Sequence, residues 1–338
     1  MLQIKRMAFD LAPELTGYAD HNIFQTLEWV NFVAVTQNAE PVIATVMEGS
    51  RIVGRFTGLI ITKYGIKILG SPFHGWSTYY MGFNLEPSVS QIDALVALKE
   101  FAFKDLKCIH LEISDRNITP DQLKAAGYLF QSREKVGYGF EIDLTKNEEE
   151  LLQAMSSSCR WSYRKSIKSG IIVEASQDIN FADDFYSQLI DVYAKQGLVP
   201  SYSIERVRKL IECLGPTGEL LLLRAKTKEG SCVATGIFPA LNDTMYFWGG
   251  ASYRSHQKLC PNEAIQLYAI KYWKSKGIKR YNMGGGGAYK RKYGGNELYV
   301  PWGRKSKVSG IDTLRNFGRS IFKLSQGVRG LIARISGE

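Results

Sequence analysis

The stretch PVIATVMEGSRIVGRFTGLIITKYGIKILGSP, residues 41–72, contains three β-rich runs separated by EGS and KYG. Alternating runs bounded by turn residues predict three consecutive antiparallel strands. Residues 219–252, ELLLLRAKTKEGSCVATGIFPALNDTMYFWGGAS, have the same form, and their first turn is again EGS. The repetition predicts that one structural unit occurs twice in the chain.

Each predicted meander is followed by a helix and a further strand. Helical periodicity covers about residues 88–105, and residues 108–114, CIHLEIS, read as the next strand. In the second half, residues 261–277 have proline in the first helical turn and glycine at the C-cap, and residues 278–284, IKRYNMG, read as a strand. The sequence therefore predicts an α/β (α+β) protein built by internal duplication, with a domain boundary near residue 145.

Composition places the chain among globular proteins. Its 338 residues are 45% hydrophobic and 22% charged, which excludes the disordered class. The five cysteines and four histidines are scattered, so neither a disulfide framework nor a metal site is expected. The sequence contains no long apolar segment of the kind that spans a membrane or forms the core of a signal peptide, and a cytoplasmic protein is expected.

The net charge of +10 is concentrated near the C-terminus. Residues 304–338 hold eight basic and two acidic side chains. Apolar residues in this stretch recur largely three and four apart, which is typical of a basic amphipathic helix. Such a helix either lies on an anionic membrane surface or packs on its own domain, and the sequence leaves both interpretations open.

The glycine-rich stretch NMGGGGAYKRKYGG, residues 282–295, invites comparison with phosphate-binding loops. It has no Gly-Lys pair, which excludes the P-loop pattern, and Tyr289 interrupts the dinucleotide pattern that would start at Gly284. The stretch instead reads as a strand exit, a turn, one basic helical turn and another strand. Because it follows the C-terminal end of a sheet strand, where α/β folds place ligand sites, we expect it to form a site.

Four segments of the sequence resemble motifs of one family. Residues 289–294, YKRKYG, resemble the aromatic-Lys-x-x-aromatic-Gly signature of the FemAB family, peptidoglycan-bridge aminoacyltransferases within the GNAT superfamily. FQTLEWVNFV at 24–33 resembles the family's Phe-Gln-x-x-x-Trp element, and RWSYRKSIKSGIIVE at 160–174 resembles its basic helix exit. Residues 252–285 resemble the family's last helix, strand and glycine turn, and the resemblance covers most of the chain up to about residue 305.

The resemblance implies two tandem GNAT-like domains, each a mixed, mostly antiparallel sheet flanked by helices. We assign residues 1–145 to the first domain, residues 146–305 to the second domain, which carries the active site, and residues 306–338 to the basic tail. The implied activity is acyl transfer. Relatives with this pattern include acetyltransferases of exopolysaccharide and cellulose clusters, so the family leaves the acyl donor open.

The resemblance places Lys290 at the reacting centre. A cation there would stabilise the oxyanion that develops when an amine attacks an ester or thioester carbonyl. Arg160, Arg164 and Lys168 recur four apart, so a helix would place them on one face, which suits a diphosphate but is equally a solvated basic surface. The other expected substrate contacts are Lys165, Trp76, Tyr79, Tyr289, Lys292 and Tyr293, although Trp76 and Tyr79 could simply cover a core.

The donor site is less well defined by the sequence. Acyl-CoA-dependent GNAT domains hold pyrophosphate in a glycine-rich loop before a helix, but here Gln257 and Leu259 stand where glycines are expected. The expected donor contacts are Arg254, Gly285 and Gly286. No resident cofactor is expected, and the donor is either aminoacyl-tRNA, which a basic protein can bind through phosphates, or an acyl-CoA held differently.

Three functional hypotheses follow. The first is an N-acyltransferase of cell-envelope biogenesis that acylates an amine of a peptidoglycan or polysaccharide precursor, with a nucleotide- or lipid-linked sugar as acceptor. The second keeps the fold and uses acetyl-CoA to acetylate an amino sugar. The third is a non-catalytic protein that binds RNA or membrane through its basic tail. DNA is not an expected partner, and peripheral contact with the inner face of the plasma membrane through residues 306–338 is compatible with all three.

Overall fold

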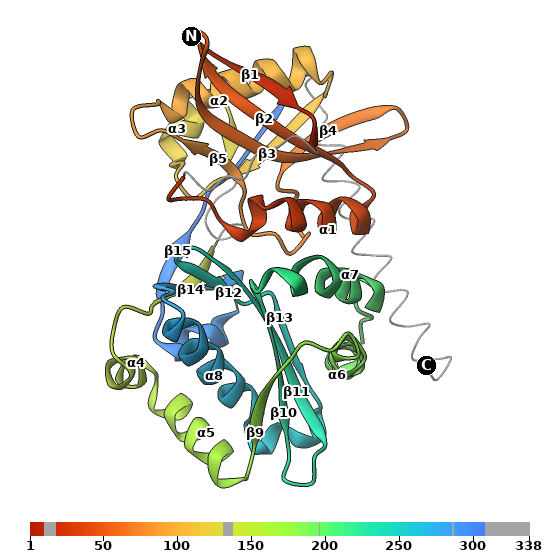
Figure 1. The fold of residues 1–338 in the computed structure, drawn as a ribbon, viewed down its shortest axis with the longest axis vertical. Helices are drawn as coiled ribbons and strands as arrows, with labels where there is room; N and C mark the ends of the chain where they lie inside the picture. The colour runs from red at the N-terminus through yellow and green to blue at the C-terminus, as the bar shows by residue number, and fades with distance from the viewer. Residues whose placement is uncertain (10–17, 131–137, 196, 286, 308–338) are drawn as a thin grey trace. The chain divides into compact units, whose positions relative to one another are not determined.

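The computed structural model describes residues 1–9, 18–130, 138–195, 197–285 and 287–307. It divides into two compact units (Figure 1). Unit 1 comprises Met1–Gly139 together with the described residues after Asn296, and unit 2 comprises Phe140–Asn296. Each unit is described by itself.

Unit 1 is built on a mixed sheet of eight strands in the order β1-β2-β3-β4-β6-β16-β7, with β5 paired to β3. The pair β4 and β6 is parallel, whereas β1–β2, β2–β3, β3–β4 and β6–β16 are antiparallel. Its elements are β1 (Leu2–Met7), η2 (Ile23–Gln25), α1 (Leu27–Gln37), β2 (Glu40–Glu48), β3 (Arg51–Lys63), β4 (Ile66–Ser71), β5 (Gly82–Leu85), α2 (Gln91–Glu100), η3 (Phe101–Asp105), β6 (His110–Ser114), α3 (Pro120–Ala125), β7 (Leu129–Phe130) and β16 (Trp302–Ser306).

Unit 2 repeats the arrangement from β1 to β6, but the next strand in its sheet is its first strand, β8, where unit 1 has β16. Its sheet has the order β15-β8-β14-β12-β11-β10-β9, with β13 paired to β11, and the pair β12 and β14 is parallel. Its elements are β8 (Tyr138–Asp143), α4 (Glu148–Ala154), α5 (Ser157–Lys168), β9 (Ile172–Ser176), α6 (Phe181–Lys195), α7 (Ile204–Leu214), η4 (Gly215–Thr217), β10 (Leu220–Lys226), β11 (Cys232–Leu241), β12 (Thr244–Tyr246), β13 (Gly249–Ser252), η5 (Arg254–Leu259), α8 (Pro261–Ser275), β14 (Arg280–Gly285), η6 (Ala288–Tyr293) and β15 (Asn296–Tyr299). The start of β8 and the end of β15 belong to this sheet although the division into units falls within both strands.

The predicted duplication is confirmed. In both units a meander leads into a helix and then into a strand that joins the sheet in parallel, as β4 and β6 do in unit 1 and β12 and β14 do in unit 2. The helix ends follow local chemistry: Thr119 and Gln122 form a capping box at the start of α3, and Pro261 occupies the first turn of α8. The third strand of the second meander differs from the prediction because it is divided into β12 and β13.

The compact units also differ from the division expected from the sequence. Unit 2 begins at Phe140 rather than 146, and the chain returns to unit 1 after Asn296. The returning strand β16 is held in the sheet of unit 1 by its ladder with β6, from Trp302 opposite Ser114 onward. The Trp302 indole N–H donates to Glu112 at 3.4 Å, which ties the side chains of the two strands together.

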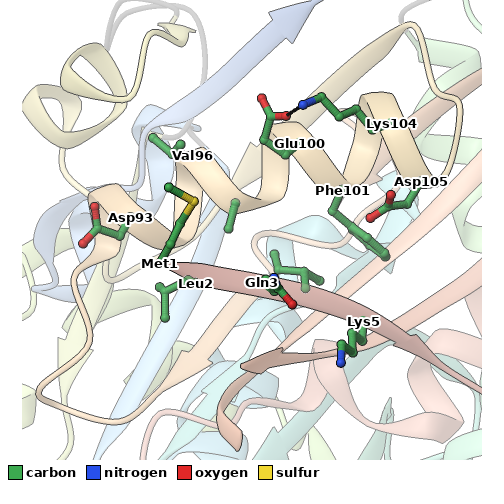
Figure 2. A pocket seen from close by; sticks show the side chains of 12 residues that line it. Met1, Leu2, Gln3, Lys5, Asp93, Val96, Glu100, Phe101, Lys104 and Asp105 are labelled. Carbon is green, nitrogen blue, oxygen red and sulfur yellow. Dashed lines mark ion pairs between the residues drawn. The ribbon is translucent and has the colours of Figure 1, made fainter. Parts of the chain in front are cut away.

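Much of the core of unit 1 lies between the sheet and α2. Ala94, Leu95 and Leu98 on α2 are fully buried in one apolar cluster with the inward side chains of β2 and β3. At the sheet edge, a groove of about 690 Å³ lies between β1 and α2, and Figure 2 shows Gln3 and Lys5 on one side and Glu100 and Phe101 on the other. None of the predicted site residues lines this groove.

Candidate active site

The strands of the unit 2 sheet diverge beside the glycine-rich turn. β14 pairs with β12 as far as Tyr246 opposite Asn282, and the Phe247 N–H donates to the Asn282 carbonyl at 3.0 Å. Beyond this point β13 continues on β11, while β14 runs on to Gly285. The divergence leaves carbonyl groups of β14 beyond Asn282 outside the ladder with β12, and a buried carbonyl needs a donor.

Lys290 supplies that donor. Its side chain is buried, and its Nζ donates to the carbonyls of Met283 at 2.6 Å and Gly285 at 2.7 Å. The ammonium also lies 5.6 Å from the centre of the Phe247 ring, within the range of a cation–π contact. An ammonium has three N–H donors, so one of them is left over after these two carbonyls, and no described residue accepts it.

The burial of Lys290 alters its titration. Loss of hydration lowers the pKa of Lys290 to about 8, because burial disfavours the charged form. The side chain is therefore still mostly protonated at neutral pH. A cation with a spare donor, held in a water-poor position at a strand end, can receive negative charge that develops on a ligand oxygen.

The short helix η6 that carries Lys290 is fixed from both sides. Gly294, with φ of +81°, ends η6, and its N–H donates to the Arg291 carbonyl at 3.1 Å. Lys292 pairs with Glu263 of α8 at 2.6 Å, and its carbonyl accepts from the Ser156 N–H at 2.9 Å. The Lys292 charge is thus compensated within the protein, although the sequence analysis placed this side chain in contact with substrate.

The predicted basic face of α5 is only partly available. The Arg160 guanidinium donates to the carbonyl of Gln153 at 3.0 Å and to that of Met155, at the C-terminal end of α4. Cations stabilise helix C-termini because the last carbonyls lack intrahelical partners. Arg160 is therefore occupied in joining α4 to α5, which differs from the expected role in holding a diphosphate.

The exposed part of α5 combines positive charge with an aromatic ring. Arg164 and Lys168 are exposed, as expected for a ligand-binding or solvated surface. The Nζ of Lys165 lies 4.9 Å from the centre of the Trp161 ring, which is 60% exposed. Three cations and an aromatic ring on one helix form a surface that suits a phosphate-bearing ligand.

The two arginines of α5 should respond differently to substitution. Arg160→Gln should lower the free energy of unfolding by about 1–2 kcal/mol, because the C-terminal carbonyls of α4 lose a charged donor. Arg164→Gln should change it by less than about 0.5 kcal/mol, because the side chain is exposed, while weakening binding of a phosphate-bearing acceptor. Urea unfolding and acceptor binding separate the two effects. Normal stability with lost acceptor binding in Arg160→Gln would show that Arg160 contacts the ligand after all.

The three predicted donor contacts differ in whether they are available to a ligand. Arg254, in η5, is engaged by Asp191, which accepts from its backbone N–H at 2.9 Å and from its Nε at 3.3 Å. Gly285 lies at the open end of β14, and a Cβ placed there would meet nothing within 4 Å. Gly286 lies outside the described residues. Of the two described donor contacts, Gly285 is the one that combines proximity to Lys290 with free space.

The start of α8 is poorly suited to a phosphate. Pro261 at its first position has no N–H, and Glu263 places a carboxylate in the first turn, with its side chain 10% exposed. A helix N-terminus attracts anions through free N–H groups and the helix dipole. Here the Glu263 carboxylate already occupies that field and pairs with Lys292, so an incoming pyrophosphate would have to compete with it.

The aromatic candidates are distributed over both units. Tyr289 and Tyr293 lie on η6 of unit 2: Tyr289 is 56% exposed beside Lys290, whereas Tyr293 is 2% exposed and packs into the core. In unit 1, the ring centres of Trp76 and Phe73 are 4.6 Å apart, and those of Tyr79 and Phe24 are 5.5 Å apart. Those two side chains are half-buried in an aromatic cluster.

The Phe-Gln-x-x-x-Trp element explains how that aromatic cluster is held. Gln25 is buried, and its Oε1 accepts from Asn84 at 3.1 Å, while its Nε2 donates to the Met81 carbonyl at 3.3 Å. The Trp29 indole N–H donates to Thr78 at 3.1 Å. The element therefore fixes the loop between β4 and β5 in unit 1.

Sequence reasoning missed three residues around Lys290. Glu263 balances Lys292, Phe247 lies against the ammonium, and Asn282 shapes the turn by accepting from the Gly284 N–H at 2.8 Å. An acidic residue in the first turn after Pro261 could have suggested Glu263 as a charge partner. No local pattern identifies Phe247, because its role depends on the break between β12 and β13.

Two further observations limit the chemistry, and a third concerns the helices. Burial raises the pKa of the Cys159 thiol to about 11, so this cysteine stays protonated at neutral pH and is a poor nucleophile. Among the described residues no group of three His, Cys, Asp or Glu side chains is placed to hold a metal ion. None of the helices in the described ranges is long and apolar enough to cross a membrane.

Two mixed sheets that share the succession of meander, helix and parallel strand, the second split beside a buried lysine, define a tandem GNAT fold. Residues 155–293, nearly all of unit 2, match the family model of the acetyltransferase (GNAT) domain. Unit 2 is therefore a GNAT domain, and the protein is an acyltransferase.

Solved structures with the same fold extend over both units. FemX has a TM-score of 0.73 at 14% identity, covering 93% of this chain and 99% of its own. L-PGS from Bacillus licheniformis has a TM-score of 0.54 at 13% identity, covering 86% and 90%. A tandem GNAT protein from the clavulanic acid biosynthesis pathway has a TM-score of 0.51 at 9% identity, covering 92% and 100%. These likenesses concern the fold, and no curated protein matches the sequence.

Proposed function

We propose that this acyltransferase transfers an acyl or aminoacyl group to an amine of a cell-envelope glycan precursor. The observation that carries the proposal is the buried Lys290 ammonium, held at 2.6 and 2.7 Å by the Met283 and Gly285 carbonyls with one donor left over. The likeness in fold to FemX agrees with the FemAB-type motifs of the sequence.

The proposed reaction forms an amide at the end of β14. The acceptor amine attacks the carbonyl carbon of an ester or thioester, and the carbonyl electrons move onto oxygen. Lys290 donates its remaining N–H to that oxyanion, which is the charge that needs stabilisation in the transition state. The carbon–oxygen or carbon–sulfur bond then breaks, and the leaving group takes up the proton that the amine loses.

The basic side chains of α5 support a phosphate-bearing acceptor. Arg164, Lys165 and Lys168 have no ion-pair partner among the described residues; Arg164 and Lys168 are exposed, and the Nζ of the half-buried Lys165 lies over the Trp161 ring. Diphosphates of nucleotide- or lipid-linked sugars offer the charge that such a surface binds. The acceptor in this proposal is a sugar precursor of that kind.

The start of α8 favours an ester donor over acyl-CoA. Pro261 and Glu263 remove the N–H group and the positive field that would hold a pyrophosphate there. An aminoacyl-tRNA does not need this position, because its phosphates can be bound elsewhere on a basic protein. Acetyl-CoA acting on an amino sugar remains the competing proposal.

The donor is tested by supplying both candidates. Purified full-length protein is incubated with a UDP-linked amino sugar or peptide and either charged tRNA or acetyl-CoA. We expect product from charged tRNA that disappears after ribonuclease treatment, and no thiol release from acetyl-CoA. Thiol release coupled to acetylated product would instead support the acetyl-CoA proposal.

The pH dependence of the transfer rate distinguishes two roles for Lys290. Its pKa is about 8, lowered by burial, so its charged form is lost as pH rises through that value. If the ammonium stabilises the oxyanion, the rate of the chemical step should fall above about pH 8. A single-turnover pH profile measures this. A rate that rises through pH 8 would mean that the neutral amine of Lys290 acts as a base.

A further inference from the structure

One end of the unit 1 sheet gathers lysines from three separate segments. The Ile109 N–H donates to the Lys67 carbonyl at 3.0 Å, and the Lys307 N–H donates to the Ile109 carbonyl at 2.9 Å. Lys107 lies two residues before Ile109, in the turn that enters β6. The tip of the β3–β4 hairpin, Lys107 and Lys307 are therefore at the same end of the sheet. We call Lys63, Tyr64, Ile66, Lys67, Lys107 and Lys307 the hairpin end.

The hairpin tip carries a large ring in an unfavourable backbone conformation. Lys63 pairs with Ile66 across the two-residue turn Tyr64-Gly65, whose φ angles are +52° and +75°. Asparagine and glycine are the residues that suit a turn with positive φ at both positions, and a tyrosine there is strained. The Tyr64 side chain is 92% exposed and Ile66 is 41% exposed, so burial within the protein does not explain either residue.

The charge of the hairpin end is positive and largely uncompensated. Among the described residues, no acidic side chain forms an ion pair with Lys63, Lys67, Lys107 or Lys307. Two acidic residues form ion pairs with other cations: Glu40 pairs with Arg6 at 2.6 Å, and Glu100 pairs with Lys104. A third, Asp105, lies close to Lys107 in the sequence, so it offsets at most one of the four lysine charges. Figure 1 shows the β3–β4 hairpin reaching out beyond the neighbouring strands of unit 1.

We propose that the hairpin end of unit 1 binds the surface of an anionic membrane. Tyrosine and an aliphatic residue at a protruding tip insert at the level of the headgroups, and the surrounding lysines bind anionic lipid phosphates. The Nζ of Lys63 lies 5.6 Å from the centre of the Tyr64 ring, but the ring is otherwise exposed, and an apolar lipid layer would bury it and so offset the backbone strain. Nucleic acid would use the lysines but gives no reason for Ile66.

The sequence after Lys307 agrees with membrane binding at the hairpin end. The chain leaves the described structure at Lys307, within the hairpin end. Residues 308–338 contain five basic and two acidic side chains together with many apolar ones. The end of unit 1 that presents Tyr64 therefore also leads into the segment whose sequence predicts a basic amphipathic helix.

The proposal is tested by vesicle co-sedimentation of the full chain. The probes are phosphatidylcholine vesicles with and without phosphatidylglycerol. Lys63→Gln with Lys67→Gln should weaken binding to the anionic vesicles about 25-fold, since each lysine near an anionic surface contributes about fivefold. Tyr64→Asn should weaken binding several-fold while leaving the protein at least as resistant to urea, because asparagine suits the turn.

A control double variant and a measurement of tRNA binding test whether the effect is specific to the hairpin end and to membranes. Lys5→Gln with Lys124→Gln removes two exposed lysines of unit 1 that are not part of the hairpin end and should keep most of the vesicle binding. Equal loss in both double variants would reduce the effect to net charge and overturn the proposal. It would also be overturned if the hairpin variants bound vesicles normally, or lost affinity for tRNA while keeping affinity for vesicles. None of these outcomes depends on the acyl-transfer activity.

Discussion

Lys290→Ala is expected to slow acyl transfer about 100-fold to 1,000-fold, a loss of about 3–4 kcal/mol of transition-state stabilisation. The substitution removes the only cation that the described structure buries between the diverging strands, where it donates to the Met283 and Gly285 carbonyls. The effect should appear in kcat rather than in KM, because the proposed hydrogen bond forms as negative charge develops. Single-turnover kinetics with a saturating donor measures it.

The control for this variant is a lysine on the same unit that is outside the site. Lys276→Ala removes an exposed side chain at the C-terminal end of α8 and should leave the rate within about twofold, because it changes folding by less than about 0.5 kcal/mol. A Lys290→Ala protein that unfolds normally in urea and still transfers at the wild-type rate would remove Lys290 from the mechanism.

Gly294→Ala is expected to destabilise unit 2 by about 2–4 kcal/mol and to reduce transfer as well. Gly294 has a φ of +81°, and a Cβ there would lie 2.6 Å from the Ala154 carbonyl oxygen. A left-handed conformation and a clash with backbone both oppose the added methyl group. Because Gly294 ends the helix that carries Lys290, relief of the clash by movement of η6 would also displace the ammonium.

Gly277→Ala provides the matched comparison. Gly277 has a φ of +89°, but a Cβ there would meet nothing within 4 Å, so only the backbone term remains, about 1 kcal/mol. Urea unfolding of the two variants should therefore differ by the cost of the clash alone. Equal stabilities would show that η6 and α4 separate without penalty.

Local pattern was sufficient to predict most of the framework. Period-two runs and glycine turns predicted the meanders around 41–72 and 219–252, because edge-to-edge strand pairing within a meander depends on neighbouring residues. The duplication of the fold followed from the repeated order. What pattern could not predict was the position of β16, since its partners β6 and β7 lie more than a hundred residues earlier in the chain.

The same limit applies to the site. The glycine-rich stretch and Lys290 were identified from sequence, and their assignment to the reacting centre remains a prediction. Arg160 looked equivalent to Arg164 because both have the same helical spacing, yet the end of α4 lies against only one of them. Charge pairing across elements, such as that between Lys292 and Glu263, depends on how α8 and η6 pack and leaves no periodic signal.

The return of the chain to unit 1 affects the order in which the protein can fold. Residues 140–296 emerge from the ribosome before Trp302–Ser306, so unit 2 can be complete while β6 still lacks its partner β16. Domains usually fold in the order of synthesis, but here the first unit to begin would be the last to finish. Until then β6 presents an open edge, with the polar side chains His110 and Glu112 that are buried in the finished protein. The nascent chain thus passes through a stage in which the first half of the molecule is the part most prone to aggregate.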